Sequence, residues 1–161
     1  MEPGLLNAQA QILLNWRLRK DSADNAPGPA YAAPQRPTVR RSGGRGQGGA
    51  IAIVQIFGTI LPRASMLNEM CGATSTQQVR SAIFEALADD TVGQIVLEFD
   101  SPGGSVSDVQ ELADDIFAAK SRKPIVGFAN SMAASAAYWL MSQCTECYVT
   151  PSGQVGSIGV Y

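Results

Sequence analysis

Residues 94–105 read Gln-Ile-Val-Leu-Glu-Phe-Asp-Ser-Pro-Gly-Gly-Ser, and this stretch decides the fold. The run from Gln94 to Asp100 is rich in apolar and β-branched residues, as a buried strand is. A glycine turn from Ser101 to Ser105 follows directly, and apolar residues then recur with helical spacing. They are Val106, Val109, Leu112, Ala113, Ile116 and Phe117. The stretch therefore predicts a strand, a glycine turn and a helix in succession.

The same alternation extends in both directions along the chain. Further strands are predicted at 51–57, where Gly58 ends the run, at 124–128, and in short apolar runs at 147–150 and 155–161. Further helices are predicted from the capping sequence 74–78 to about Asp89, and at 135–142 after a small-residue turn at 131–134. Strands and helices that alternate in this way connect through right-handed βαβ crossovers. The predicted fold class is α/β with a mostly parallel sheet.

The chain divides into three segments by composition. Residues 1–20 carry scattered apolar side chains and predict a short amphipathic helix. Residues 21–49 are rich in Pro and Gly and cannot bury enough apolar surface to offset the entropy of ordering, so they predict a flexible linker. Residues 50–161 form the predicted α/β domain. Because the chain stops inside its last apolar run, we expect this domain to be incomplete at its C-terminus.

Composition argues against several classes of function. The 161 residues carry a formal net charge of -2, which gives no global attraction to nucleic acid or to an anionic membrane. The chain has no histidine, so it cannot itself supply a Ser-His-Asp triad, a Cys-His pair or a His-containing metal site. It has three cysteines, no signal peptide and no run of roughly 18 apolar residues. We expect a soluble protein of a reducing compartment such as the cytoplasm.

Two segments fall where parallel α/β sheets place active sites, at the carboxyl ends of strands. The first is the turn at Gly103 and Gly104, whose unobstructed backbone N–H groups suit a developing oxyanion. The second is Ser135, a hydroxyl at the start of a helix among alanines too small to cover it. Each has a structural alternative: a plain turn for the glycines and a helix N-cap for Ser135. The cap or turn alternative is stronger still for Ser131.

Four motifs in this order resemble the S49 serine peptidases, the family that includes bacterial signal peptide peptidase and the phage head-maturation protease. They are the opening strand Ile-Ala-Ile-Val-Gln-Ile-Phe-Gly-Thr-Ile at 51–60, Asp-Ser-Pro-Gly-Gly-Ser at 100–105, Ser-Met-Ala-Ala-Ser-Ala-Ala-Tyr at 131–138, and Gly-Ser-Ile-Gly-Val at 156–160. The resemblance runs from about residue 49 to residue 161, and the leader rich in Pro and Gly is similar to phage-type members. It implies a Clp protease/crotonase-like architecture of repeated βαβ units.

Carried over by position, the resemblance implies a serine endopeptidase with Ser135 as the nucleophile. It gives the oxyanion hole to the backbone N–H groups of Gly104 and Ala136, with Gly103 shaping the turn. It also implies a Ser-Lys dyad, which agrees with the absence of histidine.

The lysine of this family lies well downstream of the Gly-Ser-Ile-Gly-Val strand, so we expect the general base beyond Tyr161. The lysines present are Lys20, before the linker, and Lys120 and Lys123, at the far end of the second predicted helix. At 1.5 Å per residue, that end lies about 20 Å from the proposed site. We therefore expect none of the three to act as the base.

The resemblance also implies partners: protein substrates such as phage scaffold or capsid proteins in the bacterial host cytoplasm or prohead, and other copies of the chain in a homo-oligomer. No nucleic acid, metal or cofactor is expected.

Two alternatives stay open. A non-catalytic assembly module that binds capsid proteins or full-length subunits is favoured by the missing lysine, whereas Ser135 speaks against a crotonase-type acyl-thioester enzyme. Cys144 and Cys147 have zinc-ligand or redox spacing but no second ligand pair. Glu98 and Asp100 lie on one side of a strand, where solvation is the simpler interpretation.

Overall fold

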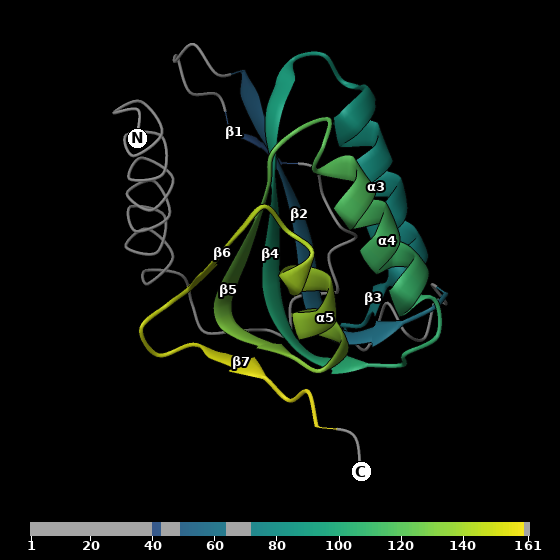
Figure 1. Ribbon diagram of the computed structural model, residues 1–161, viewed down its shortest axis with the longest axis vertical. Helices are drawn as coiled ribbons and strands as arrows, with labels where there is room; N and C mark the ends of the chain where they lie inside the picture. The colour runs from purple at the N-terminus through teal and green to yellow at the C-terminus, as the bar shows by residue number, and fades with distance from the viewer. Residues whose placement is uncertain (1–39, 43–48, 64–71, 160–161) are drawn as a thin grey trace, which may run out of the picture. The chain divides into compact units, whose positions relative to one another are not determined.

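The computed structural model describes residues 40–42, 49–63 and 72–159 (Figure 1). The helix predicted at 1–20 and most of the linker predicted at 21–49 lie outside the described residues. Within the linker segment, Arg40–Ser42 form strand β1, which pairs antiparallel with the next strand of the chain. The structure thus differs from a flexible linker at these residues, because their backbone groups join the edge of the sheet.

The described strands form one mostly parallel sheet. Its parallel strands are β2 (Ala50–Leu61), β4 (Val92–Gly104), β5 (Ile125–Ala134) and β6 (Glu146–Val149), in the order β1-β2-β4-β5-β6. Two short strands extend it: β3 (Thr74–Ser75) pairs parallel with β2, and β7 (Gln154–Gly156) pairs parallel with β5. The predicted α/β fold with a mostly parallel sheet is confirmed.

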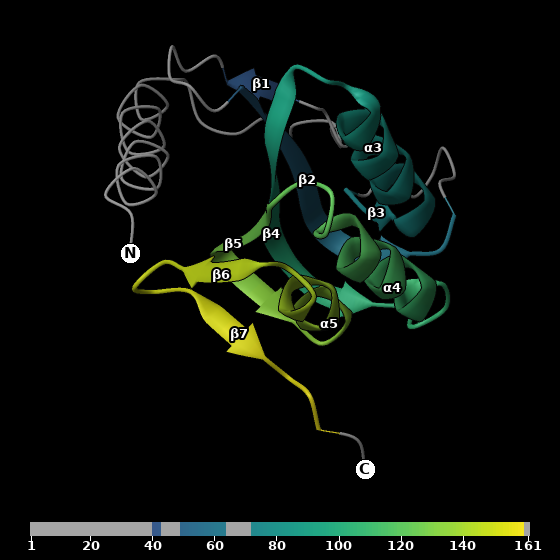
Figure 2. The same ribbon diagram turned by 45° about the horizontal axis from the view of Figure 1, so that its top comes forward.

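The helices α3 (Thr76–Ala88), α4 (Val109–Ala119) and α5 (Ala136–Ser142) lie on one face of this sheet (Figures 1 and 2). Helix α4 packs against both α3 and α5. The core lies between the helices and the sheet, where alternate strand residues such as Val54, Leu97 and Phe99 are fully buried. Burial of this apolar surface is the main favourable term in folding.

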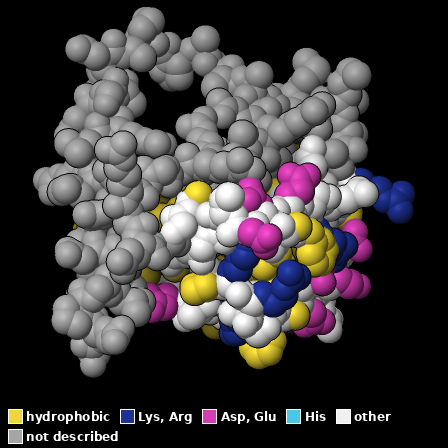
Figure 3. All heavy atoms as spheres, turned by 90° about the horizontal axis from the view of Figure 1, so that it is seen from above, with side chains coloured by type: hydrophobic (Ala, Val, Ile, Leu, Met, Phe, Trp, Pro, Cys, Tyr) yellow, Lys and Arg dark blue, Asp and Glu magenta, His cyan; other side chains and the backbone are white. Residues whose placement is uncertain are grey.

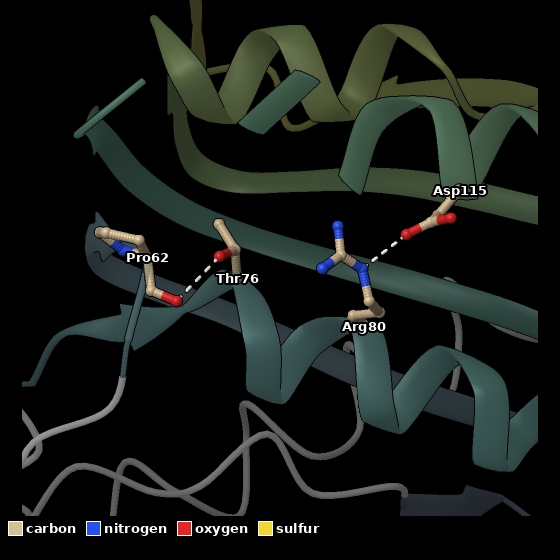
Figure 4. Close-up of polar contacts among 4 residues, drawn as sticks. All are labelled: Pro62, Thr76, Arg80 and Asp115. Atoms are coloured by element: carbon tan, nitrogen blue, oxygen red, sulfur yellow. Dashed lines mark hydrogen bonds and ion pairs between the residues drawn. The ribbon is translucent and has the colours of Figure 1, made fainter. Parts of the chain in front are cut away.

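The start of α3 is fixed by its capping residues, as the sequence predicts. Ser75 is the N-cap, and its hydroxyl accepts a hydrogen bond from the Gln78 N–H at 3.4 Å. The Thr76 hydroxyl donates to the Pro62 carbonyl at 3.1 Å, and Arg80 Nε donates to Asp115 Oδ2 at 2.6 Å (Figure 4). These contacts join α3 to the end of β2 on one side and to α4 on the other.

Three strands run further than their predicted ends. Strand β2 continues through Gly58, β4 continues to Gly104, and β5 continues through the turn predicted at 131–134. The backbone pairing continues because the register shifts at two irregularities. One lies between Phe57 and Thr59 in the β2–β4 pair, and the other lies between Phe99 and Ser101 in the β4–β5 pair. Extra residues bulge out of the ladder there and do not end it.

Two residues assigned to the buried face of the second predicted helix are exposed. Val106 is 66% exposed because α4 starts only at Val109, after Asp108 in a left-handed conformation. Phe117 is 57% exposed because the buried face of α4 is formed by Leu112, Ile116 and their helical neighbours. The last apolar run is also shorter as a strand than predicted, since β7 covers only Gln154–Gly156 and Ile158 is exposed.

The surface of the described domain carries charges of both signs. Acidic and basic side chains are interspersed on the face seen in Figure 3. Interspersed charges create no extended field of one sign on the described part of this face. Among the described residues, no helix combines the length and the hydrophobicity that crossing a bilayer requires.

Candidate active site

Ser135 is the single residue between β5 and α5, and its backbone is strained. Its φ is 54° and its ψ is -122°, a region that residues other than glycine rarely occupy. Such strain costs on the order of 1–3 kcal/mol and persists only where the surroundings fix it. A strained turn between a strand and a helix is also how nucleophile elbows expose a serine hydroxyl. The local backbone of Ser135 is thus of the kind that presents a nucleophile.

Backbone hydrogen bonds on both sides hold this turn. The Ser135 N–H donates to the Gly156 carbonyl at 2.8 Å, where β7 pairs with the end of β5. The Ser135 carbonyl accepts from the Trp139 N–H at 3.0 Å in the first turn of α5. Its hydroxyl makes no capping bond to the helix, although Ser135 occupies the N-cap position. The cap interpretation therefore fits the position of Ser135 but not the use of its hydroxyl.

Gly103 lies directly against this serine. Its φ is 97°, and a Cβ added there would meet the Ala134 carbonyl oxygen at 2.7 Å, the Ser135 Cβ at 2.8 Å and the Ala136 nitrogen at 3.0 Å. Real Cβ atoms do not approach other atoms so closely, so only glycine fits this position. The glycine turn and the serine turn, which are separate in the sequence, are in contact in the structure.

Gly104 and Ala136 flank the contact between Gly103 and Ser135. Gly104 is exposed and packs on β2, where an added Cβ would meet the Ile60 carbonyl oxygen at 2.1 Å. Ala136 is the first residue of α5, so its N–H has no acceptor within the helix. The sequence-predicted residues Gly103, Gly104, Ser135 and Ala136 are thus gathered at the ends of β4 and β5.

Sequence reasoning missed Ser101, which supports the glycine turn. This side chain is fully buried, its hydroxyl donates to the Gly58 carbonyl at 2.6 Å, and it accepts from the Gly103 N–H at 3.1 Å. Ser101 therefore ties the glycine turn to β2 from within the core. A serine that directly precedes Pro-Gly-Gly was the available signal, since a buried hydroxyl at such a place must find partners.

Asp100 and Ser131 are hydrogen-bonded to each other next to this turn. Between the pairs Phe99↔Ala129 and Ser101↔Ala133, β5 uses more residues than β4, so β5 bulges where Ser131 lies. Bulges next to active sites re-aim the residues that follow. Glu98 instead accepts from Gln55 at 3.1 Å. The two carboxylates thus have separate partners, and Ser131 holds the strand that leads to Ser135.

The described lysines make contacts at the opposite end of α4 from the glycine turn. Lys123 Nζ donates to the carbonyls of Ala86 at 2.9 Å and Asp89 at 2.7 Å, at the end of α3. Lys120 Nζ lies 4.0 Å from the centroid of the Phe117 ring. Lys20 lies outside the described residues. Neither described lysine contacts Ser135, in agreement with the expectation that they are not its base.

The described part of the chain contains no group of side chains that could bind a metal ion. No cluster of three or more His, Cys, Asp or Glu residues among residues 49–63 and 72–159 could hold a metal ion. Cys144 and Cys147, the cysteines within these ranges, are free thiols. The chemistry that the arrangement offers is that of a hydroxyl, backbone N–H groups and a strained turn.

Comparison with known sequences gives a consistent set of relatives. Residues 118–161 match the model of peptidase family S49. Head-tail preconnector protein GP5 of Enterobacteria phage P21 and capsid assembly protease C of Escherichia phage lambda are each 34% identical over 110 residues, or 68% of this chain. The matches cover 22% and 25% of those proteins. Protease 4 of Salmonella typhi is 34% identical over 115 residues, 71% of this chain and 18% of that protein. The chain spans a quarter or less of the length of these relatives.

Solved structures similar to this chain include a ClpP1 variant and an enoyl-CoA hydratase/isomerase. A ClpP1 variant from Listeria monocytogenes has a TM-score of 0.46 and 17% identity, over 64% of this chain and 53% of that one. An enoyl-CoA hydratase/isomerase from Mycobacterium abscessus has a TM-score of 0.48 and 14% identity, over 74% of this chain and 50% of that one.

Proposed function

Because this chain belongs to peptidase family S49, we propose that it carries the nucleophile and the oxyanion hole of a serine endopeptidase. Ser135 is the proposed nucleophile. The observation that carries this proposal is the strained backbone of Ser135 between β5 and α5, held against Gly103. A hydroxyl whose position is fixed at such a cost, and which is not used to cap its helix, is available to attack a peptide carbonyl.

The oxyanion hole in this proposal consists of the N–H groups of Ala136 and Gly104. The Ala136 N–H is adjacent to the nucleophile in the chain and has no acceptor within α5. Gly104 directly follows Gly103, whose virtual Cβ meets the Ser135 Cβ and the Ala136 nitrogen, and this proximity supports the role of its N–H. Two such donors stabilise the tetrahedral intermediate.

The proposed general base is a lysine that residues 1–161 do not supply. The chain has no histidine, and both described lysines make other contacts. A lysine in a site that excludes water has a lowered pKa and can take the serine proton, after which water hydrolyses the acyl-enzyme. A Ser-Lys dyad is therefore the arrangement that fits these residues.

The proposed substrates are phage structural proteins. One relative is named a head-tail preconnector protein and another a capsid assembly protease. We extend this to cleavage of scaffold or capsid proteins during head assembly, in the host cytoplasm or the prohead, by a protein that self-associates.

A serine-directed fluorophosphonate probe tests the proposal. The protein is expressed from its gene together with any coding sequence that follows Tyr161, it is labelled, and the modified residue is found by mass spectrometry. We expect the label on Ser135, its loss in Ser135→Ala, and its retention in Ser142→Ala, which removes an exposed hydroxyl at the other end of α5. Labelling of Ser131, or equal labelling of the Ser135→Ala variant, contradicts the assignment.

A non-catalytic assembly module is the second candidate. The observation that favours it is that both described lysines make contacts away from Ser135, so the described residues lack a base. On this reading the protein binds capsid proteins or full-length subunits without cleaving them. If the folded protein shows no labelling of any serine, the result supports the assembly module and contradicts the peptidase proposal.

A further inference from the structure

Cys144 and Cys147 lie together at the other end of α5 from Ser135, and the proposed function does not use them. Cys144 follows the C-terminal end of α5, and Cys147 lies in β6. The Cys144 N–H and the Cys147 thiol both donate to the Met141 carbonyl, at 3.0 and 3.1 Å. One carbonyl thus gathers both residues at the end of the helix.

The absence of a side chain at Gly127 makes room for the pair. A Cβ added at Gly127 would lie 3.1 Å from Cys144 Sγ. Cys147 is the register partner of Gly127 in the β5–β6 pair, so its side chain projects on the same side of the sheet. The two thiols therefore share the space over Gly127. Cys144 is buried, whereas Cys147 is exposed and can meet a reagent from solution.

We propose that Cys144 and Cys147 are a vicinal dithiol that peroxide oxidises to an intramolecular disulfide, with Cys147 as the reacting thiol and Cys144 as the resolving thiol. The bond joins the end of α5 to β6 and can be reversed by a thiol reductant. This inference is independent of the proposed peptidase activity.

The electrostatics of the pair agree with this division of roles. A hydrogen bond from Cys144, together with the positive charge of Lys120, lowers the pKa of Cys147 to about 7. The same bond and burial raise the pKa of Cys144, which stays a thiol. Low-pKa, accessible cysteines next to a resolving cysteine are the ones that oxidants select.

The reaction balances with hydrogen peroxide as the only oxidant. The Cys147 thiolate attacks one peroxide oxygen, the S–O bond forms, the O–O bond breaks and hydroxide leaves, which gives a sulfenic acid. Cys144 Sγ then attacks this sulfur, the S–S bond forms and the S–O bond breaks. The Cys144 proton leaves with the departing oxygen as water, and the proton first lost by Cys147 neutralises the hydroxide. Two thiols and one peroxide give one disulfide and two waters.

Peptide mass spectrometry tests the proposal on the whole chain. Trypsin releases Lys123–Tyr161 as one peptide, because no Lys or Arg follows Lys123 and Lys123 precedes a proline. This peptide contains Cys144 and Cys147 but not Cys71. The folded protein is treated with hydrogen peroxide, free thiols are blocked with N-ethylmaleimide, and the peptide is weighed. We expect the peptide from the oxidised protein to carry no N-ethylmaleimide group and to be lighter by two hydrogens than the unblocked, reduced peptide.

Matched variants separate the two roles. Cys71→Ser removes the third thiol of the chain and is expected to leave the result unchanged. Cys144→Ser is expected to stop at a sulfenic acid on Cys147, which dimedone traps. At pH 7, Cys147 of the folded protein is expected to react with hydrogen peroxide about fivefold faster than Cys147 of the protein unfolded in urea. The reason is that the larger thiolate fraction in the folded protein outweighs the lower nucleophilicity of that thiolate.

Four outcomes overturn the proposal. In the first, the peptide still takes up two N-ethylmaleimide groups after treatment at peroxide concentrations that oxidise Cys71. In the second, Cys147 pairs with Cys71 or with another chain in place of Cys144. In the third, Cys147 proceeds to a sulfinic acid although Cys144 is present. In the fourth, dimedone traps no sulfenic acid at Cys147 in the Cys144→Ser variant, which removes the assigned role of Cys147.

Discussion

Single residues decide whether the two turns of the site can meet. Gly103 occupies a left-handed conformation and leaves no space for a Cβ between Ala134 and Ala136. Gly72 has a similar φ of 76°, but nothing lies within 4 Å of an added Cβ. The two glycines therefore separate the cost of backbone conformation from the cost of crowding the serine.

We predict that Gly103→Ala abolishes probe labelling of Ser135 and destabilises the fold by about 2–3 kcal/mol, since backbone strain and overpacking add. Gly72→Ala is the control, with a cost of about 1 kcal/mol from its φ alone and full labelling. Urea unfolding and labelling rates measure the two effects. Full labelling of Gly103→Ala would show that the glycine turn does not determine the position of the nucleophile.

Ser101 is a positioning residue for the same turn, because it acts through Gly103 and Gly58. Ser101→Ala removes the hydrogen bonds to the buried Gly103 N–H and to the partly buried Gly58 carbonyl, at a cost of about 1–3 kcal/mol. We also expect slower labelling of Ser135 with an unchanged pH profile, since the turn loosens but the base is untouched. Ser105→Ala, which removes only an exposed bond to the Ser107 N–H, is the control and is expected to change neither quantity. A purely structural role for Ser101 predicts lower stability with normal labelling.

The helices of this domain depend on contacts made at their ends. Lys123 follows α4 in the chain, yet its ammonium binds the last carbonyls of α3, which have no partners within that helix. A positive charge at this end also complements the helix dipole. Lys123 thus joins the ends of two helices that are adjacent in space.

We predict that Lys123→Met lowers the free energy of unfolding by about 1–2 kcal/mol, because hydrogen bonds to a charged group are lost from a partly buried site. Lys120→Met removes a similar charge that only stacks on an exposed ring, and is expected to cost less than about 1 kcal/mol. Thermal and urea unfolding of both variants give the comparison. Equal costs would mean that Lys123 contributes through its charge alone.

The type and order of the elements could be predicted from the sequence, but their ends could not. Each predicted strand and helix from residue 50 to Gly156 is present, because apolar period and capping residues such as Ser75 are local signals. The strands continue past Gly58 and Ser131 because bulges allow the backbone pairing to go on beyond them. This pairing depends on neighbours in space, which the local sequence does not specify. Val106 was misplaced because α4 starts only at Val109, after the left-handed Asp108, and Phe117 was misplaced because Leu112 and Ile116 lie on the buried face of the helix.

The site shows the same division between local and spatial information. Small residues around Ser135 and the paired glycines indicated two segments at predicted strand ends, and both segments lie at the ends of β4 and β5. The contact of Gly103 with Ser135, the bond from Ser135 to Gly156 and the support from Ser101 each join segments far apart in the chain. No local pattern encodes such contacts.

At the scale of the whole molecule, the site is assembled by the parallel sheet. The ends of β4 and β5 bring Gly103 to Ser135, and β7 supplies the Gly156 carbonyl that holds the serine backbone. The sheet thereby brings together the proposed nucleophile and the proposed oxyanion donors, and no described lysine contacts them. The chemistry of proton removal is the remaining requirement of the proposed peptidase.

The last prediction concerns that proton. If a lysine encoded beyond Tyr161 is the base, labelling of Ser135 in the longer protein should rise with pH to a plateau whose midpoint is about 7–8, well below the ordinary lysine pKa of about 10.4. Residues 1–161 alone should label on the order of a thousandfold more slowly and without a plateau in this range, because the base is absent. Substituting the lysine by methionine in the longer protein should reproduce the slow behaviour. Rapid labelling of residues 1–161 alone would instead place the base within these residues and would refute a base beyond Tyr161.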